Sequence, residues 1–377
     1  MGFQLQSRET AGIQALRVTI TTNASVIVKK SIIYVEPMLR IGVNGMGRIG
    51  RLFTRAALSD PEYGKSFEIV AYNDLVDTKT IAFLMKYDSV HGRLPYKVAY
   101  TEDSIEIDGR KIRAFSNPDP SKIPWGEVGV DLVVESTGRF RARKDASKHL
   151  RDGVKKVLIS APSGDADVTI VPGVNDEMLD VKKHDVISAA SCTTNCLAPM
   201  VKVLLDNFGF RKGYMSTVHA YTNDQRLLDL VHKDLRRARA AALSIILTTT
   251  GAAKALHLVI PEVKGKMHGI ALRVPVADGS ITDLTALLER EVTLEEVREA
   301  YRKAAEGKLK GILEYTEEPI VSIDIVGNPH SCILDGLSIT VVGERNDLVK
   351  VLGWYDNEWG YSNRLVDVIK LIIKQGV

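Results

Sequence analysis

The chain contains few cysteines. Only Cys192, Cys196 and Cys332 occur among its 377 residues. So small and odd a number does not support a disulfide framework, and it indicates a reducing compartment, for which we predict the cytoplasm. Long apolar runs are also absent, because none approaches the roughly 20 residues that cross a bilayer. We therefore expect no membrane association.

The charge balance is nearly even, with 50 basic and 47 acidic residues and a net charge of +3. This excess is too small to indicate nucleic acid as the main partner, although it suits a modest anionic substrate. Internal repeats and low-complexity tracts are lacking. The length and the 45% hydrophobic content indicate about two domains with a sizeable apolar core.

Residues 1–37 differ in character from the rest of the chain. They mix Thr, Ser, Val and Ile with a few charges. A secretory signal would need a longer apolar core, and a transit peptide would contain more Arg and less Glu. We interpret 1–37 as an N-terminal extension of unknown role, and Met38 as a possible alternative start.

The first half of the remaining chain predicts an α/β fold. Apolar segments typical of buried parallel strands alternate with helical segments, of which 48–58 is the clearest. The alternating segment 104–114 contains Asp108-Gly109 and predicts an inserted hairpin. The predicted strands are 39–43, 68–72, 131–135 and 156–160.

The second half predicts an α+β domain with a mixed or antiparallel sheet, because segments 338–342 and 350–355 alternate polar and apolar residues. Residues 364–374 predict a final helix. A helix also follows Cys192, but Pro199 should interrupt it. We therefore expect its regular part to begin nearer Leu197.

The segment Gly45-Met46-Gly47-Arg48-Ile49-Gly50 follows a predicted strand and opens a predicted helix. Such glycines allow a tight turn and close approach of a pyrophosphate to the helix N-terminus. Asp74 ends the next strand, where a carboxylate can bind the adenosine ribose hydroxyls and repel a 2′-phosphate. The pattern predicts an NAD site and favours NAD over NADP.

Two further strand ends carry small polar residues, Ser136-Thr137-Gly138 and Ser160-Ala161-Pro162. The carboxyl ends of parallel strands line the ligand crevice of such sheets. Ordinary turn chemistry explains these residues at least as well as a nicotinamide contact.

Cys192 is the candidate nucleophile and His219 the candidate base. A cysteine attacks as its thiolate, so it needs a base or another neighbour that lowers its pKa. Ser191 could cap a helix whose dipole lowers the thiol pKa. A buried structural cysteine is the alternative. Because no second pair of ligands accompanies Cys192 and Cys196, we expect no metal site.

Candidates for binding a phosphorylated substrate are Arg273, Thr222 and the run Thr248-Thr249-Thr250-Gly251. An arginine fork matches phosphate oxygens, and backbone N–H groups near Gly251 can add to it. A surface charge and a strand end are equally good explanations of these residues taken alone.

Taken together, these segments resemble the phosphorylating glyceraldehyde-3-phosphate dehydrogenase family. The likeness covers residues 38–377 and is specific in the combination of SCTTNC, HAYT, TTTGAAKA and WYDNEWGYSNR. The resemblance implies a Rossmann-type NAD domain at 38–191, a catalytic domain at 192–357, and a last helix in 358–377 that packs back on the NAD domain. It also implies a homotetramer.

The resemblance further implies a role for each matched residue. Cys192 is expected to be the nucleophile and His219 the base. The expected NAD contacts are Gly45, Gly47, Arg48, Ile49, Asp74, Thr137, Ser160, Asn357 and Tyr361. Thr222 and Arg273 are expected to bind the substrate phosphate. The expected inorganic phosphate side is Ser191, Thr193, Arg237, Thr250 and Gly251.

The implied reaction is the oxidation of glyceraldehyde 3-phosphate with inorganic phosphate and NAD through a cysteine thioester. Erythrose-4-phosphate dehydrogenase is a close alternative, since it uses the same cysteine and histidine. An RNA-binding side activity of the basic run 232–239 is a second alternative. The resemblance implies instead that this run is a subunit-interface loop, and its lack of interleaved aromatic residues argues against base stacking.

Overall fold

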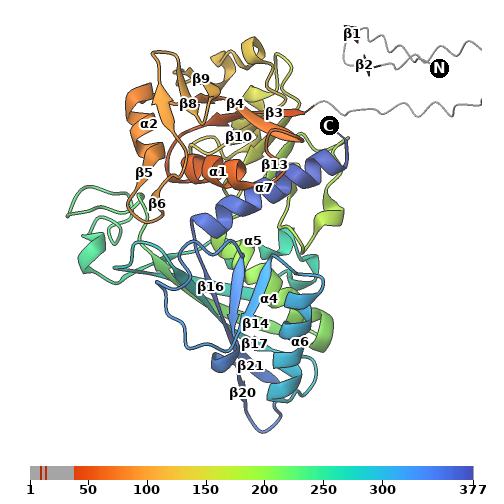
Figure 1. Ribbon diagram of the computed structural model, residues 1–377. Coiled ribbons are helices and arrows are strands. Elements are labelled where there is room, and N and C mark those ends of the chain that lie inside the picture. The colour runs from red at the N-terminus through yellow and green to blue at the C-terminus, as the bar shows by residue number, and fades with distance from the viewer. Residues whose placement is uncertain (1–8, 11–12, 15–37, 377) are drawn as a thin grey trace, which may run out of the picture.

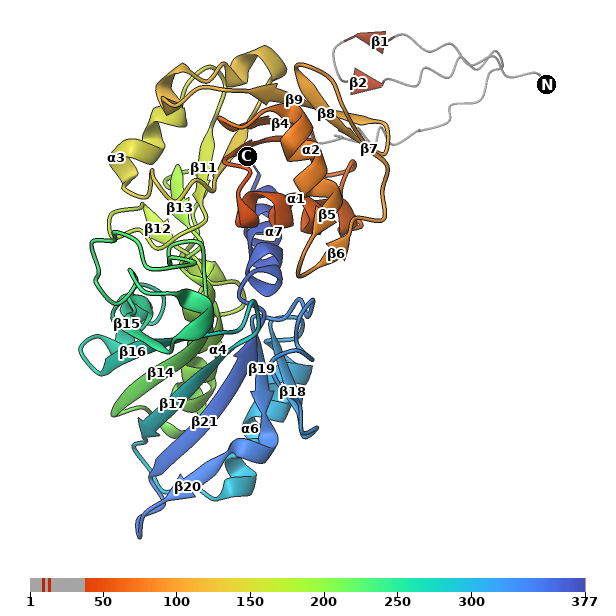
Figure 2. The same ribbon diagram turned by 90° about the vertical axis from the view of Figure 1, so that its left-hand side faces the viewer.

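The computed structural model describes residues 9–10, 13–14 and 38–376. Two large sheets, each with its own helices, lie one above the other, and the chain crosses between them (Figures 1 and 2). The expected N-terminal extension 1–37 falls outside the described residues, apart from the paired two-residue strands β1 (Glu9–Thr10) and β2 (Ile13–Gln14).

The first sheet has nine strands, and those from β12 to β9 pair in parallel. In spatial order its strands are β12 (Val168–Thr169), β13 (Val186–Ser188), β11 (Lys156–Ile159), β10 (Leu132–Glu135), β3 (Leu39–Asn44), β4 (Phe67–Asn73), β9 (Arg110–Phe115), β8 (Ser104–Ile107) and β7 (Val98–Tyr100). Strands β10 and β11 are buried throughout, as expected when both faces of a parallel sheet are covered. The parallel α/β prediction is confirmed.

The predicted hairpin is also present. Strands β8 and β9 pair antiparallel around Asp108 and Gly109, and both turn residues have a positive φ. The helices of this part of the chain are α1 (Arg48–Ser59), α2 (Thr78–Lys86) and the short α3 (Arg143–Ala146). A separate two-stranded hairpin, β5 (Tyr87–Asp88) and β6 (Gly92–Arg93), extends toward the second sheet (Figure 1).

The second sheet has eight strands and is mixed. Its main path is β15 (Ile246–Thr249), β16 (Met267–Val274), β14 (Lys212–Ala220), β17 (Ser280–Leu287), β21 (Leu348–Tyr355), β19 (Cys332–Asp335) and β18 (Leu313–Thr316), with β20 (Thr340–Val342) beside β21. Burial alternates along β17 and β21, so one face is in the core and the other is more open. The mixed-sheet prediction is confirmed.

Helices α4 (Cys192–Phe208), α5 (Ala252–Ala255) and α6 (Leu294–Glu306) accompany this sheet. Helix α4 contacts β17, β19 and β21, and its apolar residues enter the same buried cluster as those strands. Helix α6 begins with a capping box between Thr293 and Glu296. Short 3₁₀ turns complete the structure at 120–122, 125–128, 147–149, 176–178, 241–243, 256–258, 261–263 and 336–338.

The last helix, α7 (Trp359–Lys374), begins five residues before the predicted 364–374. Oδ1 of Asp356 accepts hydrogen bonds from the backbone N–H groups of Glu358 and Trp359, and these bonds order the first turn. Leu365 and Ile369 are fully buried, and α7 packs against α1. The end of the chain therefore contributes to the core beneath the first sheet (Figure 2).

No helix in the described part of the chain combines the length and apolar character that crossing a membrane requires.

Candidate active site

The glycine-rich turn joins β3 to α1 and leaves room for a ligand. Gly45 has φ +95°, which favours glycine, and a Cβ on Gly50 would lie 2.0 Å from the carbonyl oxygen of Gly45. A Cβ on Gly47 would meet nothing within 4 Å, and this N-cap of α1 receives no side-chain hydrogen bond. Free helical N–H groups beside open space fit the pyrophosphate of NAD.

Asp74 lies at the end of β4, as predicted. Its Oδ2 accepts a hydrogen bond from the backbone N–H of Met46 at 2.7 Å, and its Oδ1 accepts one from Val76 at 3.0 Å. The carboxylate thus anchors the glycine-rich turn to the neighbouring strand. Asp74 does not line the cleft between the two sheets that contains Cys192 and His219.

Arg48, expected to contact NAD, is held by two carboxylates. Its guanidinium lies 2.5 Å from Oδ2 of Asp88 and also pairs with Glu358, which directly follows Asn357. These ion pairs hold the first turn of α1 against Asp88 of β5 and against Glu358, which follows β21. Nearby charges therefore fix the Arg48 side chain without a ligand.

Cys192 is the first residue of α4. The side chain of Ser191 accepts a hydrogen bond from Thr194 N–H, so the predicted cap is present. The predicted interruption at Pro199 is wrong, because α4 runs unbroken from Cys192 to Phe208. Pro199 is buried, as are most residues of the helix. We attribute its tolerance to this packing, which offsets the missing N–H.

The structure brings the predicted nucleophile and base together. Sγ of Cys192 lies 3.5 Å from Nε2 of His219, which is the penultimate residue of β14. Arg273 is the neighbour of His219 across the β14–β16 pair, and its Nη1 lies 2.6 Å from Nδ1 of His219. A nucleophile, a base and a cation therefore form one contiguous group.

The pKa of Cys192 shifts in the direction opposite to the one predicted. Burial raises the pKa of the thiol to about 11, and Arg273 and Thr193 only partly offset this. Burial, with the charge of Arg273, lowers the pKa of His219 to about 3. In the resting protein both partners are consequently neutral at pH 7.

Two groups compete for Nδ1 of His219. Arg273 can donate to it, whereas the carbonyl oxygen of Ala220, 2.7 Å away, can only accept. When Nδ1–H donates to Ala220, Nε2 is free to take a proton from Cys192. When Arg273 donates to Nδ1, Nε2 carries the hydrogen instead. The position of Arg273 therefore decides whether His219 can act as a base.

Tyr355 supports this group and was missed from the sequence. Its hydroxyl lies 3.0 Å from Oγ1 of Thr193 and 2.8 Å from Oγ1 of Thr217, and its ring packs edge-on against His219. Side chains along β21 alternate between the two faces of the sheet, and this alternation directs Tyr355 into the core. No local motif signals its contact with the active histidine.

A cleft of about 680 Å³ between the two sheets contains most of the predicted residues. Its volume lies within the range of small-molecule sites. The predicted residues on its wall are Gly47, Arg48, Ile49, Thr137, Ser160, Ser191, Cys192, His219, Thr222, Arg273, Asn357 and Tyr361. Residues on the wall that the sequence analysis missed include Tyr221, Asn223, Asp224, Ala277 and Glu358.

Asn357 and Tyr361 are both fixed by hydrogen bonds. Oδ1 of Asn357 accepts a bond from Ser280 Oγ at 2.5 Å, which leaves its amide nitrogen as the unassigned donor. The Tyr361 hydroxyl donates to the carbonyl oxygen of Ala190, two residues before Cys192. Both side chains are thereby held at the edge where the two sheets meet.

The structure does not place Gly45, Asp74, Thr193, Arg237, Thr250 and Gly251 on the cleft wall. Arg237 pairs with Asp224, which is on the wall, and its Nε donates to Thr248 at 2.9 Å. Arg239 of the same basic run pairs with Asp229. These ion pairs reduce the number of free cations that the run 232–239 could offer to RNA.

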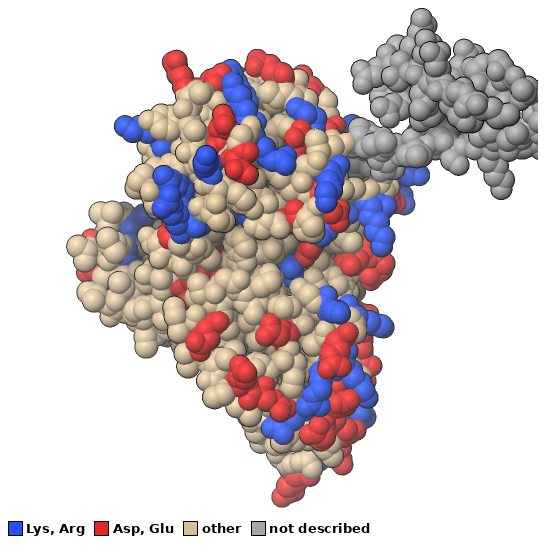
Figure 3. Space-filling model, viewed as in Figure 1, with Lys and Arg blue, Asp and Glu red and all other residues tan. Residues whose placement is uncertain are grey.

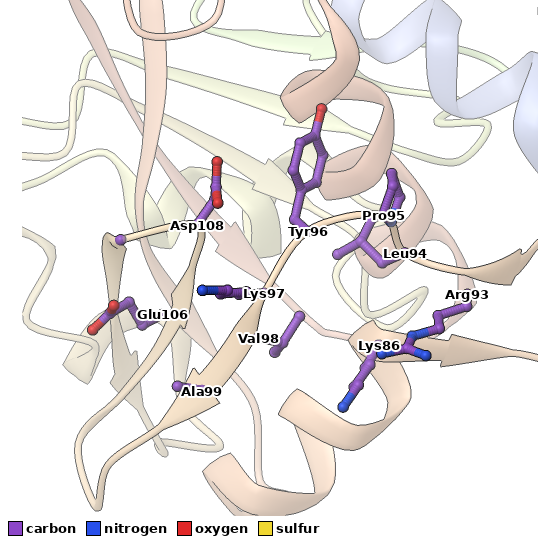
Figure 4. A pocket seen from close by; sticks show the side chains of 11 residues that line it. Lys86, Arg93, Leu94, Pro95, Tyr96, Lys97, Val98, Ala99, Glu106 and Asp108 are labelled. Atoms are coloured by element: carbon purple, nitrogen blue, oxygen red, sulfur yellow. The ribbon is translucent and has the colours of Figure 1, made fainter.

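A second hollow lies outside this site, between α2 and the β7–β8 hairpin (Figure 4). Its charged side chains are Lys86, Arg93, Lys97, Glu106 and Asp108, and most are exposed. None of the residues on its wall is a cysteine or a histidine, so the hollow offers neither a nucleophile nor an imidazole base.

Comparison with known proteins is consistent with this site. Residues 39–143 match the model of the glyceraldehyde 3-phosphate dehydrogenase NAD binding domain, and residues 191–357 match that of the C-terminal domain. The chain is 60% identical over 337 residues to "Glyceraldehyde-3-phosphate dehydrogenase 2" of Streptomyces avermitilis, covering 89% of this chain and 99% of the relative.

Two further relatives are similarly close. The glyceraldehyde-3-phosphate dehydrogenase of Streptomyces coelicolor is 61% identical over 338 residues, covering 89% of this chain and 99% of the relative. That of Geobacillus stearothermophilus is 57% identical over 339 residues, covering 90% of this chain and 99% of the relative.

The two-sheet fold and these matches define an NAD-dependent oxidoreductase. More specifically, the chain belongs to the glyceraldehyde-3-phosphate dehydrogenase family.

Proposed function

We propose that the protein oxidises and phosphorylates glyceraldehyde 3-phosphate to 1,3-bisphosphoglycerate with NAD. The observation that carries this proposal is the 3.5 Å contact between Cys192 Sγ and His219 Nε2 on the wall of a cleft shared with the glycine-rich turn. Family membership selects the substrate. The names of the matched relatives do not favour erythrose-4-phosphate dehydrogenase.

In this proposal the NAD site is built around the N-terminus of α1. Gly45 and Gly47 would admit the pyrophosphate, Arg48 and Ile49 would supply backbone N–H groups, and Asp74 would bind the adenosine ribose. Thr137, Ser160, Tyr361 and the free amide nitrogen of Asn357 would hold the nicotinamide end. When bound, NAD supplies the two-electron acceptor.

We assign the substrate phosphate to Thr222 and Arg273. An anion at Arg273 offsets the positive charge that lowers the His219 pKa, and it draws the guanidinium away from Nδ1. Nδ1–H can then donate to Ala220, and Nε2 becomes a base. Substrate binding thereby activates Cys192.

The inorganic phosphate side is assigned to Ser191, Thr193, Arg237, Thr250 and Gly251. Of these five residues, only Ser191 lines the cleft. The Asp224–Arg237 ion pair connects this group to the wall. Entry of phosphate would replace Asp224 as the partner of Arg237.

The chemical steps follow from this arrangement. His219 takes the thiol proton as Cys192 adds to the aldehyde carbon, and it returns that proton to the new alkoxide to give a thiohemiacetal. His219 then accepts the hydroxyl proton while the carbon gives up its hydrogen, with the electron pair, to the acceptor that NAD would supply, leaving a thioester. Inorganic phosphate attacks the thioester, and Cys192 leaves as a thiolate that takes back the proton held by His219. The Cys192 N–H and His219 stabilise the oxyanion.

We also propose a homotetramer. The loop between β14 and β15 carries several strongly exposed apolar side chains, and the face of its lobe on the left in Figure 3 is mostly uncharged, although the loop also carries the exposed Lys233, Arg236 and Arg239. Such a surface is typical of a subunit interface. The exposed residues are Leu227, Leu228, Leu230, Val231, Leu235, Leu243 and Ile245.

We place the domain boundaries at 38–191 and 192–357, with 358–377 returning to the NAD domain, and the protein in the cytoplasm. The contact of α7 with α1 supports the return of 358–377 to the NAD domain. The three free cysteines are compatible with a reducing compartment such as the cytoplasm.

The decisive experiment is a spectrophotometric assay of NADH formation with glyceraldehyde 3-phosphate, with and without inorganic phosphate, using NAD or NADP. Fast turnover that needs phosphate and prefers NAD is expected. Faster turnover of erythrose 4-phosphate under the same conditions would contradict the assigned substrate.

A further inference from the structure

A buried group outside the reaction chemistry joins the two sheets. His91 comes from the β5–β6 hairpin, Asp278 from the loop between β16 and β17, and Asp356 from the segment between β21 and α7. Nε2 of His91 lies 3.2 Å from Oδ2 of Asp356 and 3.3 Å from Oδ2 of Asp278. The three side chains are exposed by 6%, 1% and 0% for His91, Asp278 and Asp356.

One oxygen of this group has no hydrogen-bond partner. Oδ2 of Asp278 is buried and receives no hydrogen bond, although Oδ1 accepts one from Gly279 N–H. A single Nε2–H of His91 can serve only one of the two carboxylates, and its hydrogen-bonding geometry favours Asp356. An ionised buried carboxylate oxygen without a partner is costly, so this oxygen needs either a proton shared with Asp356 or a bound cation.

Surrounding groups hold these side chains in place. Nδ1 of His91 lies 3.6 Å from Oδ1 of Asp88, which itself accepts backbone N–H bonds from Val90 and His91. Oδ2 of Asp356 accepts a bond from Gly327 N–H at 2.7 Å. A carboxylate behind the histidine is the arrangement that orients metal-bound imidazoles in proteins.

We propose that His91, Asp278 and Asp356 form a binding site for a divalent cation. The three candidate ligand atoms lie within 4.8 Å of one another. One imidazole nitrogen and two carboxylate oxygens suit ions such as Mn²⁺ and Zn²⁺. The cation gives the unpaired oxygen of Asp278 a partner and neutralises both buried carboxylates.

This proposal departs from the expectation of no metal site, which rested on the spacing of Cys192 and Cys196. The site is separate from the Cys192 chemistry and does not depend on the proposed function. His91 belongs to the β5–β6 hairpin, whereas Asp278 and Asp356 lie in loops beside the second sheet, so the cation would link these two parts of the chain. Ala277 and Asn357, which are next to the two aspartates in the sequence, line the cleft. A ligand that binds only the folded state raises the melting temperature.

The test uses the full chain, freed of metal by chelation and with its thiols alkylated, so that Cys192 cannot bind the ion. Mn²⁺ is titrated and followed by electron paramagnetic resonance and by the melting temperature. Wild type is expected to bind one Mn²⁺ per chain and to melt higher. Asp278→Asn, which preserves the side-chain shape, should bind at least about tenfold more weakly.

Asp283→Asn on β17, whose carboxylate pairs with Lys350 at the surface, is the matched control and should bind like wild type. Failure of wild type to bind at about 1 mM Mn²⁺ would overturn the proposal. Equal binding by Asp278→Asn would overturn it as well. If that variant does not fold, paramagnetic broadening of the His91 resonances in wild type locates the ion, and broadening elsewhere alone counts against the site.

Discussion

His219 and His91 are both buried, yet their surroundings drive their protonation in opposite directions. His219 faces the guanidinium of Arg273, and burial together with that charge lowers its pKa. His91 faces Asp356, Asp278 and Asp88, whose hydrogen bonds and charges raise its pKa despite burial. The sign of the neighbouring charge, rather than burial alone, therefore decides which histidine can act as a base near pH 7.

The largest effect is expected from removing the sulfur beside His219. Cys192→Ala should lower turnover by at least about 1,000-fold, because Cys192 is the only thiol among the described residues that line the cleft. NAD binding, followed by fluorescence quenching, should remain. Cys332→Ala, in the buried strand β19, is the matched control. Substantial turnover by Cys192→Ala would remove Cys192 from the mechanism.

Removing the base should have the next largest effect. His219→Asn should lower kcat by roughly 100-fold or more, because the thiol loses its proton acceptor while burial keeps its pKa high. The rate of iodoacetamide alkylation against pH measures this directly and should shift to higher pH. His257→Asn, at a half-buried position outside the cleft, is the control. An unchanged dependence of the alkylation rate on pH would show that His219 does not control the reactivity of Cys192.

Changing the charge of Arg273 tests whether the sign of the neighbouring charge sets the pKa of His219. Arg273→Met should raise the pKa of His219 toward its ordinary value and weaken binding of the phosphorylated substrate roughly tenfold or more. Arg273→Lys keeps the charge but loses the fork, so it should raise KM without the same change in the pH profile. Identical pH profiles for the two variants would contradict the role given to charge.

The smallest effect is expected at His91, with a chelator present. In the folded protein the pKa of His91 is above its ordinary value of about 6.5. The contribution of His91 to the free energy of unfolding is therefore complete below about pH 6.5 and is lost as the pH rises through the pKa of the folded state. Burial and Asp356 also raise the pKa of Asp278, and this too favours the folded state at lower pH. Asp278→Asn should therefore flatten the decline in melting temperature above pH 6.5. A decline as steep as in wild type would contradict this account.

Features encoded by adjacent residues could be predicted from the sequence. The glycine-rich turn, the hairpin at Asp108-Gly109 and the cap at Ser191 each depend on a few neighbouring positions. The juxtaposition of Cys192 and His219 could be predicted because both lie in specific motifs. The resemblance extended this prediction to Arg273 and Asn357.

Features that depend on tertiary packing could not be predicted in this way. The helix through Pro199 is held by its buried surroundings, and the direction of the Cys192 pKa depends on burial that spacing does not encode. His91, Asp278 and Asp356 lie far apart in the chain and meet only where the two sheets join. No local pattern indicates that meeting.

The packing of α7 against α1 has a consequence for biosynthesis. The apolar stripe of α7, including Leu365 and Ile369, fills the core beneath a sheet whose strands are made much earlier. A ribosome would release those strands long before their covering helix is translated. The first sheet can therefore reach its final packing only after α7 has left the ribosome, and loss of the turns of α7 would expose that core to chaperones and proteases.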